Sequence, residues 1–137
     1  MDRERYIRLI KEEEGYRNRV YLDSLGIPTC GWGHALHVGS TVPHAACEAF
    51  FAYDLDRVDK DYAFMRLRLD PVREAVVKCM LFQLGLGGVQ KFKRFLSAID
   101  RQDWPGAAME MLNSKWAEQT PNRVRRLADM ILTGKMQ

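Results

Sequence analysis

The hydrophobic pattern at the start of the chain is that of one amphipathic helix. Its apolar stripe consists of Tyr6, Ile7, Leu9 and Ile10, and charged residues fill the positions between them. This pattern predicts a helix over residues 3–14 with Asp2 as its N-cap. Gly15 follows directly, where a left-handed residue commonly ends a helix.

Two short strands are predicted after this helix. The strand candidates are residues 19–22 and 29–32, and the segment between them is rich in the turn formers Asp, Ser, Gly and Pro. Gly31 and Gly33 then allow the backbone to bend or to approach another group closely. We therefore expect a β-hairpin in this part of the chain.

The rest of the chain is predicted to be helical. Apolar residues at helical spacing between Phe51 and Tyr62 predict a linking helix over about residues 42–66. Asp70 is an N-cap followed by proline, and the apolar sequence VREAVVKCMLFQLG predicts a fully buried central helix. Shorter helices are expected to begin at Asp103 and Thr120.

These elements predict an α+β fold that is predominantly helical. We expect a single domain, residues 1–137, built from two lobes that share one chain. The small N-terminal lobe spans about residues 12–45 and contains the hairpin, and the helical C-terminal lobe spans about residues 69–137.

Charge adds one feature to this picture. Residues 1–70 carry 10 Lys/Arg against 12 Asp/Glu, whereas residues 71–137 carry 11 against 6, within a net charge of +3. The basic C-terminal half favours an anionic partner, although a solvated basic face accounts for the same numbers.

Cysteines and hydropathy indicate the compartment. Cys30, Cys47 and Cys79 have no metal-binding spacing and fit the reduced thiols of a cytosolic chain, so no metal or cofactor is expected. The charged N-terminal segment is unlike a signal peptide, and the apolar runs are too short for stable membrane insertion.

The first helix ends on three carboxylates, Glu12 to Glu14, although the C-terminus of a helix disfavours negative charge. A hairpin packed beside that end could turn Glu14, Asp23 and Thr29 into one cleft. Two carboxylates across a cleft can hydrolyse a glycosidic bond, one as the acid and one as a base or stabiliser. A frayed helix end and an Asp in an Asx-turn are the alternative interpretation.

The helix end and the neighbouring Glu13 both disfavour the charged form of Glu14, so we expect a raised pKa for this carboxyl group. Asp23, in a polar turn with backbone donors, is expected to stay ionised. Such a difference between two carboxyl groups separates a general acid from a general base.

The spacing of Glu14, Asp23 and Thr29, followed by the sequence GWGH, resembles the catalytic signature of the T-even-type phage lysozymes, which are muramidases of glycoside hydrolase family 24. The segments LDPVREAVVKCMLFQLGLGGVQKF and NSKWAEQTPNRVRR are also similar to that family. The resemblance is loose over residues 5–65 and strong over residues 69–134.

This resemblance implies a lysozyme-like fold whose first helix packs on the C-terminal lobe. It makes Glu14 the acid, Asp23 the second carboxylate and Thr29 a residue that positions water by donating to Asp23. It also implies inversion at the anomeric carbon, for which the carboxyl groups stand roughly 6.5–9.5 Å apart.

Further roles follow from the same resemblance. Arg123 would pair with Glu14, which opposes a rise in the pKa of that carboxyl group, and His34 would pair with Asp54 unless it is only structural. The residues implied to contact substrate are Tyr21, Ala35, Phe82, Phe95, Glu110 and Lys115. Three of these residues differ from the family pattern. Phe95 and Glu110 replace small polar or amide residues, and Lys115 replaces an arginine.

The segment between the GWGH sequence and the linking helix is also shorter than in the type member of the family, so one helix of the small lobe is expected to be missing. The implied protein is a monomeric endolysin that binds peptidoglycan glycan strands. It would gather in the host cytoplasm and reach the wall in the periplasm after a holin opens the membrane.

Three other interpretations of the sequence compete with this one. A wall-binding module without activity would need to lose Glu14 or Asp23, and both are present. A nucleic-acid binder could use the segment TPNRVRRLADMIL, but three arginines on one helix are a weak signal, so no nucleic-acid partner is expected. A lytic transglycosylase usually has no equivalent of Asp23.

Overall fold

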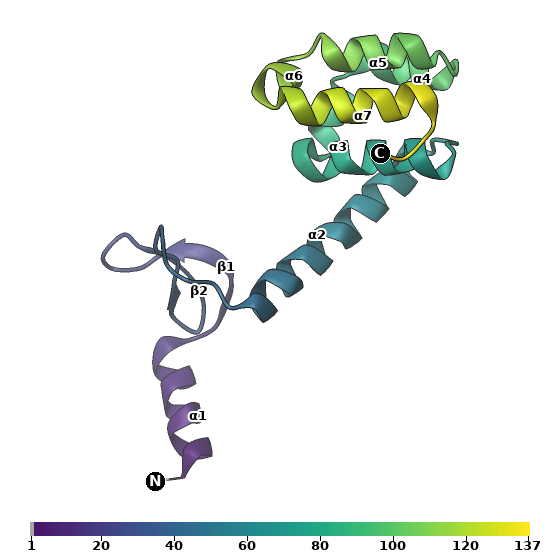
Figure 1. Cartoon of the computed structure of the whole chain (residues 1–137). Coiled ribbons are helices and arrows are strands. Elements are labelled where there is room, and N and C mark those ends of the chain that lie inside the picture. Colours follow the sequence, from purple (N-terminus) through teal and green to yellow (C-terminus); the bar gives the residue numbers. More distant parts are fainter. Residues whose placement is uncertain (1) are drawn as a thin grey trace. The chain divides into compact units, whose positions relative to one another are not determined.

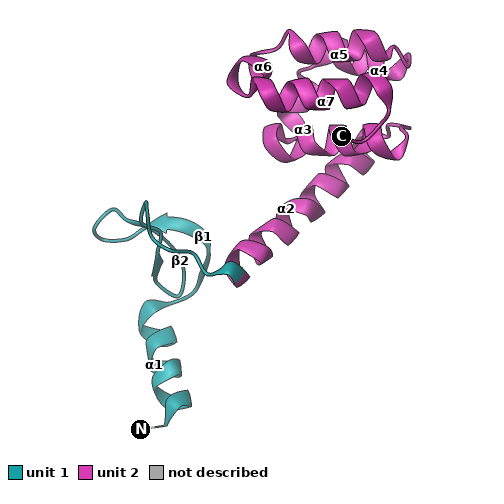
Figure 2. Cartoon of the chain, in the orientation of Figure 1, with its two compact units in different colours: residues 1–44 teal, residues 45–137 magenta. Residues whose placement is uncertain are grey.

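The computed structural model describes residues 2–137. The chain divides between His44 and Ala45 into two compact units, which Figure 2 colours separately. Each unit has its own secondary structure, and α2 (His44–Met65) begins at the boundary between them. No helix within residues 2–137 is both long enough and apolar enough to cross a membrane.

The N-terminal unit consists of one helix and a small antiparallel sheet (Figure 1). Helix α1 (Arg3–Glu14) has the predicted limits, and the Asp2 side chain accepts a hydrogen bond from the N–H of Arg5 as its N-cap. Gly15 follows with φ 70° and ψ 160°, which is a positive-φ end of the helix but not the left-handed cap that was predicted.

The sheet has the strand order β1-β2-β3. Strands β1 (Arg17–Leu22) and β2 (Pro28–Gly31) form the predicted hairpin, and β3 (His34–Ala35) is an additional strand that pairs with β2. The pattern did not predict β3, because a two-residue strand is too short to show alternation of polar and apolar residues.

The second unit is helical throughout its regular structure. After α2 come α3 (Pro71–Gln90), α4 (Lys93–Asp100), α5 (Trp104–Leu112), α6 (Lys115–Gln119) and α7 (Pro121–Thr133). The predicted starts at Asp70, Asp103 and Thr120 are confirmed, since each of these residues is the N-cap of its helix. Gly85 has φ 72° and interrupts α3 where the sequence predicted its end.

The hydrophobic core lies in this helical unit and is built mainly from α3, α4, α5 and α7. Its largest fully buried side chains are Phe95, Met80, Leu81, Met111 and Ile131. The prediction that α3 is buried on all sides is wrong, because Cys79 is exposed and Phe82 keeps 41% of its surface exposed. The core therefore covers only one face of α3.

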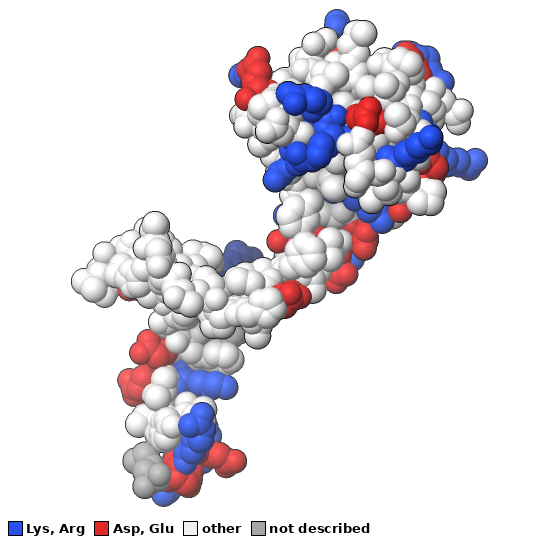
Figure 3. Space-filling model, in the orientation of Figure 1, with Lys and Arg blue, Asp and Glu red and all other residues white. Residues whose placement is uncertain are grey.

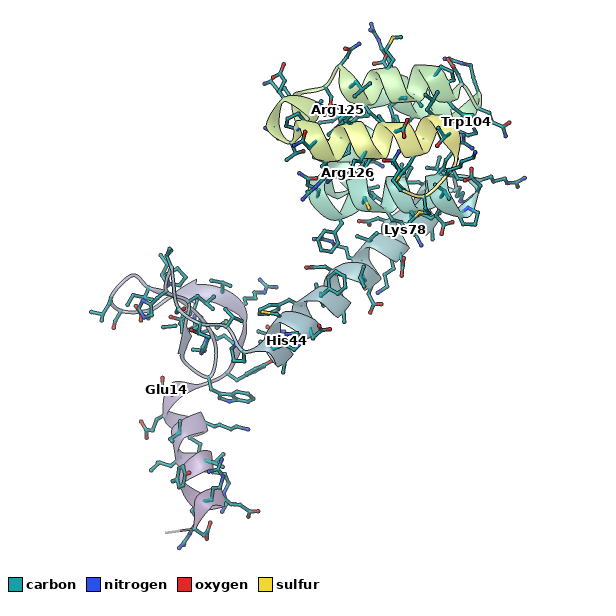
Figure 4. All side chains as sticks on the ribbon, viewed as in Figure 1. Glu14, His44, Lys78, Trp104, Arg125 and Arg126 are labelled. Atoms are coloured by element: carbon teal, nitrogen blue, oxygen red, sulfur yellow. The ribbon has the colours of Figure 1, made fainter. Side chains whose placement is uncertain are left out.

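Polar side chains hold α2 against α3. The Lys78 ammonium group lies 3.0 Å from an oxygen of Asp59 on α2 and 3.2 Å from one of Glu74 on α3. It also lies 5.2 Å from the centre of the Tyr62 ring, and Figure 4 shows Lys78 where the two helices meet. The hydrogen bonds that Lys78 donates to Asp59 and to Glu74 raise the pKa of its ammonium group.

Candidate active site

Glu14 is the last residue of α1, at the point where the chain continues into the sheet (Figure 4). Its side chain is exposed and lies against the backbone of Gly33. A Cβ atom at Gly33 would overlap the carboxyl group of Glu14, with the Cδ atom only 2.9 Å away. Gly33 also has φ +68°, so glycine satisfies two requirements at this position.

Trp32, at the end of the hairpin, packs against residues at the end of α1. The Lys11 ammonium group lies 4.2 Å from the centre of the Trp32 ring, and the Tyr16 ring lies 4.8 Å from it. Cation–π contacts and tilted aromatic pairs are both favourable, so they stabilise the packing of Trp32 against the end of α1. The sequence GWGH therefore supplies a contact through Trp32 and room for Glu14 through Gly33.

Asp23 is held in the hairpin turn by the backbone. Its Oδ1 atom accepts hydrogen bonds from the N–H groups of Leu25 at 2.8 Å and Ile27 at 2.9 Å. Its own N–H donates to the carbonyl of Ile27 at 3.0 Å. The turn is thus the Asx-turn of the alternative interpretation, yet this turn also fixes the carboxylate and leaves Oδ2 without a hydrogen bond from residues 2–137.

Thr29 is the buried polar side chain of the described chain, with 3% of its surface exposed. Its hydroxyl donates to the Ile27 carbonyl at 2.8 Å, and not to Asp23 as expected. Because the Ile27 N–H donates to Asp23, the two side chains are connected through one residue. The hydroxyl oxygen of Thr29 keeps lone pairs that can accept from water.

Three of the residues expected at the site share one row of the sheet. Tyr21 pairs with Thr29 across β1 and β2, and Thr29 pairs with Ala35 across β2 and β3. Directly opposed residues of neighbouring strands place their side chains on the same face. The Arg17 guanidinium lies 4.3 Å from the centre of the Tyr21 ring and supports that end of the row.

In the helical unit, Gln83 connects two residues of the family-like segments. Its Oε1 atom accepts from Arg123 at 2.7 Å and from the indole N–H of buried Trp116 at 3.0 Å. Phe82, Gln83 and Arg123 line one hollow of about 310 Å³. Sequence reasoning missed Gln83, although a polar residue within the apolar sequence MLFQLG was a usable signal.

The remaining expected residues of the helical unit have different surroundings. The Phe82 ring lies 5.8 Å from that of Phe51 on α2, and Lys115 is exposed as the first residue of α6. Asp54 and Glu110 are half-buried. The assignment of Phe95 to the substrate path needs correction, because its ring has 0% exposed surface and belongs to the core.

The expected pairs Glu14–Arg123 and His34–Asp54 each join residues of different units, so they stay predictions, as does the packing of α1 on the C-terminal lobe. Glu14, Asp23, Thr29, Tyr21, His34 and Ala35 all belong to the N-terminal unit. This unit alone brings together an exposed carboxyl group, a carboxylate fixed by backbone donors and a buried hydroxyl group. That is a set of groups able to act as acid, base and water ligand.

Comparison with known proteins identifies relatives along nearly the whole chain. A family model described as phage lysozyme matches residues 11–129. A probable T4-type lysozyme of Dictyostelium discoideum is 30% identical over 159 aligned positions, which cover 93% of this chain and 94% of that protein. Because 159 positions exceed the 137 residues of this chain, that relative has residues that this chain lacks.

Two further relatives are larger phage proteins. The pre-baseplate central spike protein Gp5 of Enterobacteria phage T4 is 29% identical over 94% of this chain and 28% of its own length. The peptidoglycan hydrolase gp36 of Pseudomonas phage phiKMV is 30% identical over 84% of this chain and 14% of its own length. The resemblance seen in the sequence is confirmed by these matches.

Proposed function

The chain belongs to the phage lysozyme family and is a peptidoglycan-hydrolysing enzyme, and we propose that it hydrolyses one specific glycosidic bond of the glycan strand with inversion at the anomeric carbon. The bond is the β-1,4 linkage between N-acetylmuramic acid and N-acetylglucosamine. The observation that most supports acid–base hydrolysis is that one unit holds two carboxyl groups with different surroundings: Glu14 is exposed at the end of α1, and Asp23 is fixed by backbone donors in the hairpin turn.

In this proposal Glu14 donates a proton to the glycosidic oxygen as the bond to the leaving sugar breaks. Its contact with Gly33 limits the positions that the carboxyl group can adopt. A restricted general acid is more effective than a free one, because less orientation has to be gained in the transition state. The leaving sugar departs as a neutral alcohol.

Asp23 acts as the general base in the same step. Its Oδ1 atom is occupied by two backbone N–H groups, so Oδ2 is the oxygen free to accept a proton from the attacking water. Thr29 holds that water as an acceptor, since its hydroxyl proton is directed to the Ile27 carbonyl. Water then attacks the anomeric carbon on the face opposite the leaving oxygen, which inverts its configuration.

Other residues are proposed to support these three. Arg123 orients Glu14, and Gln83 with Trp116 fixes Arg123 in the helical unit. His34 pairs with Asp54. Tyr21 and Ala35 contact the glycan from the row they share with Thr29, and Phe82 and Lys115 contact it from the helical unit.

The biological role that we propose is lysis of the host cell by a monomeric enzyme. It accumulates in the host cytoplasm and acts on the wall in the periplasm once a holin has permeabilised the membrane. This role rests on membership of the phage lysozyme family.

Clearing of a suspension of outer-membrane-permeabilised Gram-negative cells tests the proposed activity. Wild type is compared with Glu14→Gln and with Glu12→Gln, which changes a neighbouring exposed carboxylate in the same helix end. We expect Glu14→Gln to lose at least about 100-fold in rate, the scale of general acid catalysis, and Glu12→Gln to keep its rate. A fully active Glu14→Gln variant would exclude Glu14 as the acid.

A further inference from the structure

Lys11, in the last turn of α1, lies within reach of the proposed acid but does not pair with it. A helical side chain meets the residues one turn away, and the only carboxylate at such a position from Lys11 is Glu14. Within residues 2–137, however, neither Lys11 nor Glu14 takes part in an ion pair or a side-chain hydrogen bond. The contact that replaces this pair is made by Trp32.

Trp32 holds the ammonium group of Lys11 over its ring, with the nitrogen 4.2 Å from the ring centre. The ring of Tyr16 packs against that of Trp32, with 4.8 Å between the two centres and 42° between the two planes. Tryptophan is the strongest aromatic partner of a cation, and such a contact typically contributes more than one ion pair along an exposed helix. Lys11 therefore stays on the ring and not on the carboxylate.

Consecutive residues of one turn contact the lysine and the glutamate. Trp32 binds Lys11, and the next residue in the chain is Gly33, whose backbone lies against the carboxyl group of Glu14. If the ring did not attract the ammonium group, the carboxyl group one turn along α1 would be its partner. A cation beside a carboxyl group favours the ionised form, and an ionised carboxylate cannot donate a proton. The position of Lys11 therefore bears on the proposed proton transfer.

We propose that Trp32 is a positioning residue of the reaction, because its ring keeps the Lys11 ammonium group from pairing with Glu14. The carboxyl group of Glu14 then retains the proton that it donates to the glycosidic oxygen. This inference rests on the proposed role of Glu14 as the acid. Arg123 is proposed to orient the same carboxyl group, and a second cation beside it would stabilise the ionised form further. Trp32 itself acts through Lys11 and donates nothing to the substrate.

Substitutions that keep or remove the aromatic face at position 32 test this role in the clearing assay. Trp32→Leu keeps an apolar side chain but removes the ring that attracts the cation. We expect it to lower the initial rate of clearing about threefold, a factor that corresponds to one exposed cation–π contact. Trp32→Phe keeps an aromatic face and should keep most of the rate.

A second substitution in the Trp32→Leu variant separates this role from a structural one. Lys11→Met removes the ammonium group that would pair with Glu14, so it should restore the rate of Trp32→Leu to near that of wild type. A purely structural defect would not be repaired by the loss of a further side chain. Arg8→Met is the matched control, because Arg8 is an exposed cation of α1 that lies too far along the helix to reach Glu14. It should restore nothing.

Fluorinated tryptophans placed at position 32 alone test the same contact without a change of shape. Fluorine withdraws electron density from the ring face, which weakens the attraction for a cation while the ring still packs against Tyr16. We expect the rate to fall stepwise as fluorine atoms are added to the otherwise unchanged chain, and to stay constant when the chain also carries Lys11→Met. Thermal unfolding shows whether each protein keeps the fold, and the fluorinated series decides the question if Trp32→Leu does not fold.

The results distinguish this inference from the proposed function. A folded Trp32→Leu variant that is as active as wild type, no recovery on addition of Lys11→Met, or a rate that does not depend on fluorination would overturn the role of Trp32. A fully active Glu14→Gln variant would instead contradict the proposed acid. Recovery by Lys11→Met and not by Arg8→Met, together with an inactive Glu14→Gln variant, supports Trp32 as the positioning residue.

Discussion

Backbone groups, and not side-chain partners, fix the three residues proposed to carry catalysis. Two backbone N–H groups donate hydrogen bonds to Asp23, and the hydroxyl of Thr29 donates one to a backbone carbonyl. The backbone of Gly33 limits the positions that the Glu14 carboxyl group can adopt. Ile27 serves both Asp23 and Thr29, because its N–H and its carbonyl each form a hydrogen bond with one of them. Substitution of the Ile27 side chain therefore leaves these contacts in place.

The contact between Gly33 and Glu14 predicts that adding a methyl group at position 33 lowers activity. Gly33→Ala places a Cβ atom on the Glu14 carboxyl group and also strains a backbone with φ +68°. We expect lysis to fall by at least about tenfold, because a displaced acid loses its orientation. Strain in the left-handed region adds roughly 1–2 kcal/mol of destabilisation, measured by chemical unfolding.

Gly26→Ala is the matched control for this substitution. Gly26 has φ +78°, so its backbone strain is similar, but a Cβ atom there has no neighbour within 4 Å. Gly26→Ala should lose similar stability and keep its activity at a temperature where both variants are folded. Equal activity of the two variants would mean that the contact with Glu14 does not matter.

At the scale of secondary-structure elements, Arg73 joins three helices of the core. Its guanidinium donates to the carbonyl of Ile131 at 2.6 Å and to that of Leu132 at 3.2 Å, both in the last turn of α7. It also lies 4.0 Å from the centre of the Trp104 ring at the start of α5, and 3.1 Å from Asp70. Its side chain has only 12% of its surface exposed.

Arg73→Ala is expected to destabilise the helical unit by about 3 kcal/mol, because two helix carbonyls and Asp70 lose a charged donor. Arg73→Lys should recover part of this loss, since an ammonium group can bind one carbonyl but cannot stack on Trp104 as a planar group. Urea unfolding followed by circular dichroism measures the difference. Arg68→Ala, at an exposed arginine, should change stability little.

The contact between α2 and α3 predicts how stability depends on alkaline pH. Burial and the negative charge of Glu74 raise the pKa of Tyr62 to about 12, and its hydroxyl is buried without a hydrogen bond within the described structure. A folded pKa above the unfolded value of about 10 favours the protonated form. The stability from Tyr62 is therefore complete below pH about 10 and is lost as pH rises towards the folded pKa.

Absorbance of tyrosinate during a pH titration measures this effect. Wild type should show a component that ionises near pH 12, and Tyr62→Phe should lack that component. Tyr53→Phe, which removes an exposed tyrosine on the same helix, should keep it. Identical titration curves for the two variants would contradict the environment described for Tyr62.

The limits of the elements could be predicted where a cap or a long pattern marked them. Asp2, Asp70 and Gly85 are such cases, and the structure confirms each boundary. Phe95 was misjudged because resemblance placed it by alignment, whereas its position on the apolar face of α4 directs the ring into the core. Gln83 was missed because its role depends on Trp116 and Arg123, which lie about 33 and 40 residues later.

The site itself was predictable only in part. Glu14, Asp23 and Thr29 were predicted as catalytic residues from their spacing and from the family resemblance, and that assignment stays a prediction. The hydrogen bond from Thr29 to Ile27 depends on hairpin geometry that spacing does not specify. The exposed face of α3 at Phe82 was likewise not predictable, because apolar residues occupy nearly every face of this helix in the sequence pattern. Local patterns define elements, whereas contacts between elements require their packing.

At the scale of the whole molecule, charge is distributed unevenly along the chain. Residues 71–137 hold 11 Lys/Arg against 6 Asp/Glu, and Figure 3 shows charged side chains across the helical unit while the visible part of the sheet is almost free of them. A basic surface attracts an anionic polymer over distances of about 10 Å at 0.1 M salt.

Salt should therefore affect the two kinds of substrate differently. Raising the ionic strength is expected to slow digestion of intact anionic walls more than cleavage of short neutral chito-oligomers, because only the first association is assisted by charge. Initial rates on both substrates across a salt series provide the measurement. An equal response of both rates would refute electrostatic attraction to the wall.

We propose that Glu14 and Asp23 hydrolyse the bond on the reducing side of N-acetylmuramic acid with inversion. Proton NMR of a digest of peptidoglycan fragments, recorded within minutes and followed by mass spectrometry, tests it directly. We predict that wild type first releases the α-anomer of a reducing N-acetylmuramic acid and that Glu14→Gln releases none. A β-anomer as first product, a reducing N-acetylglucosamine or a 1,6-anhydro sugar would contradict this account.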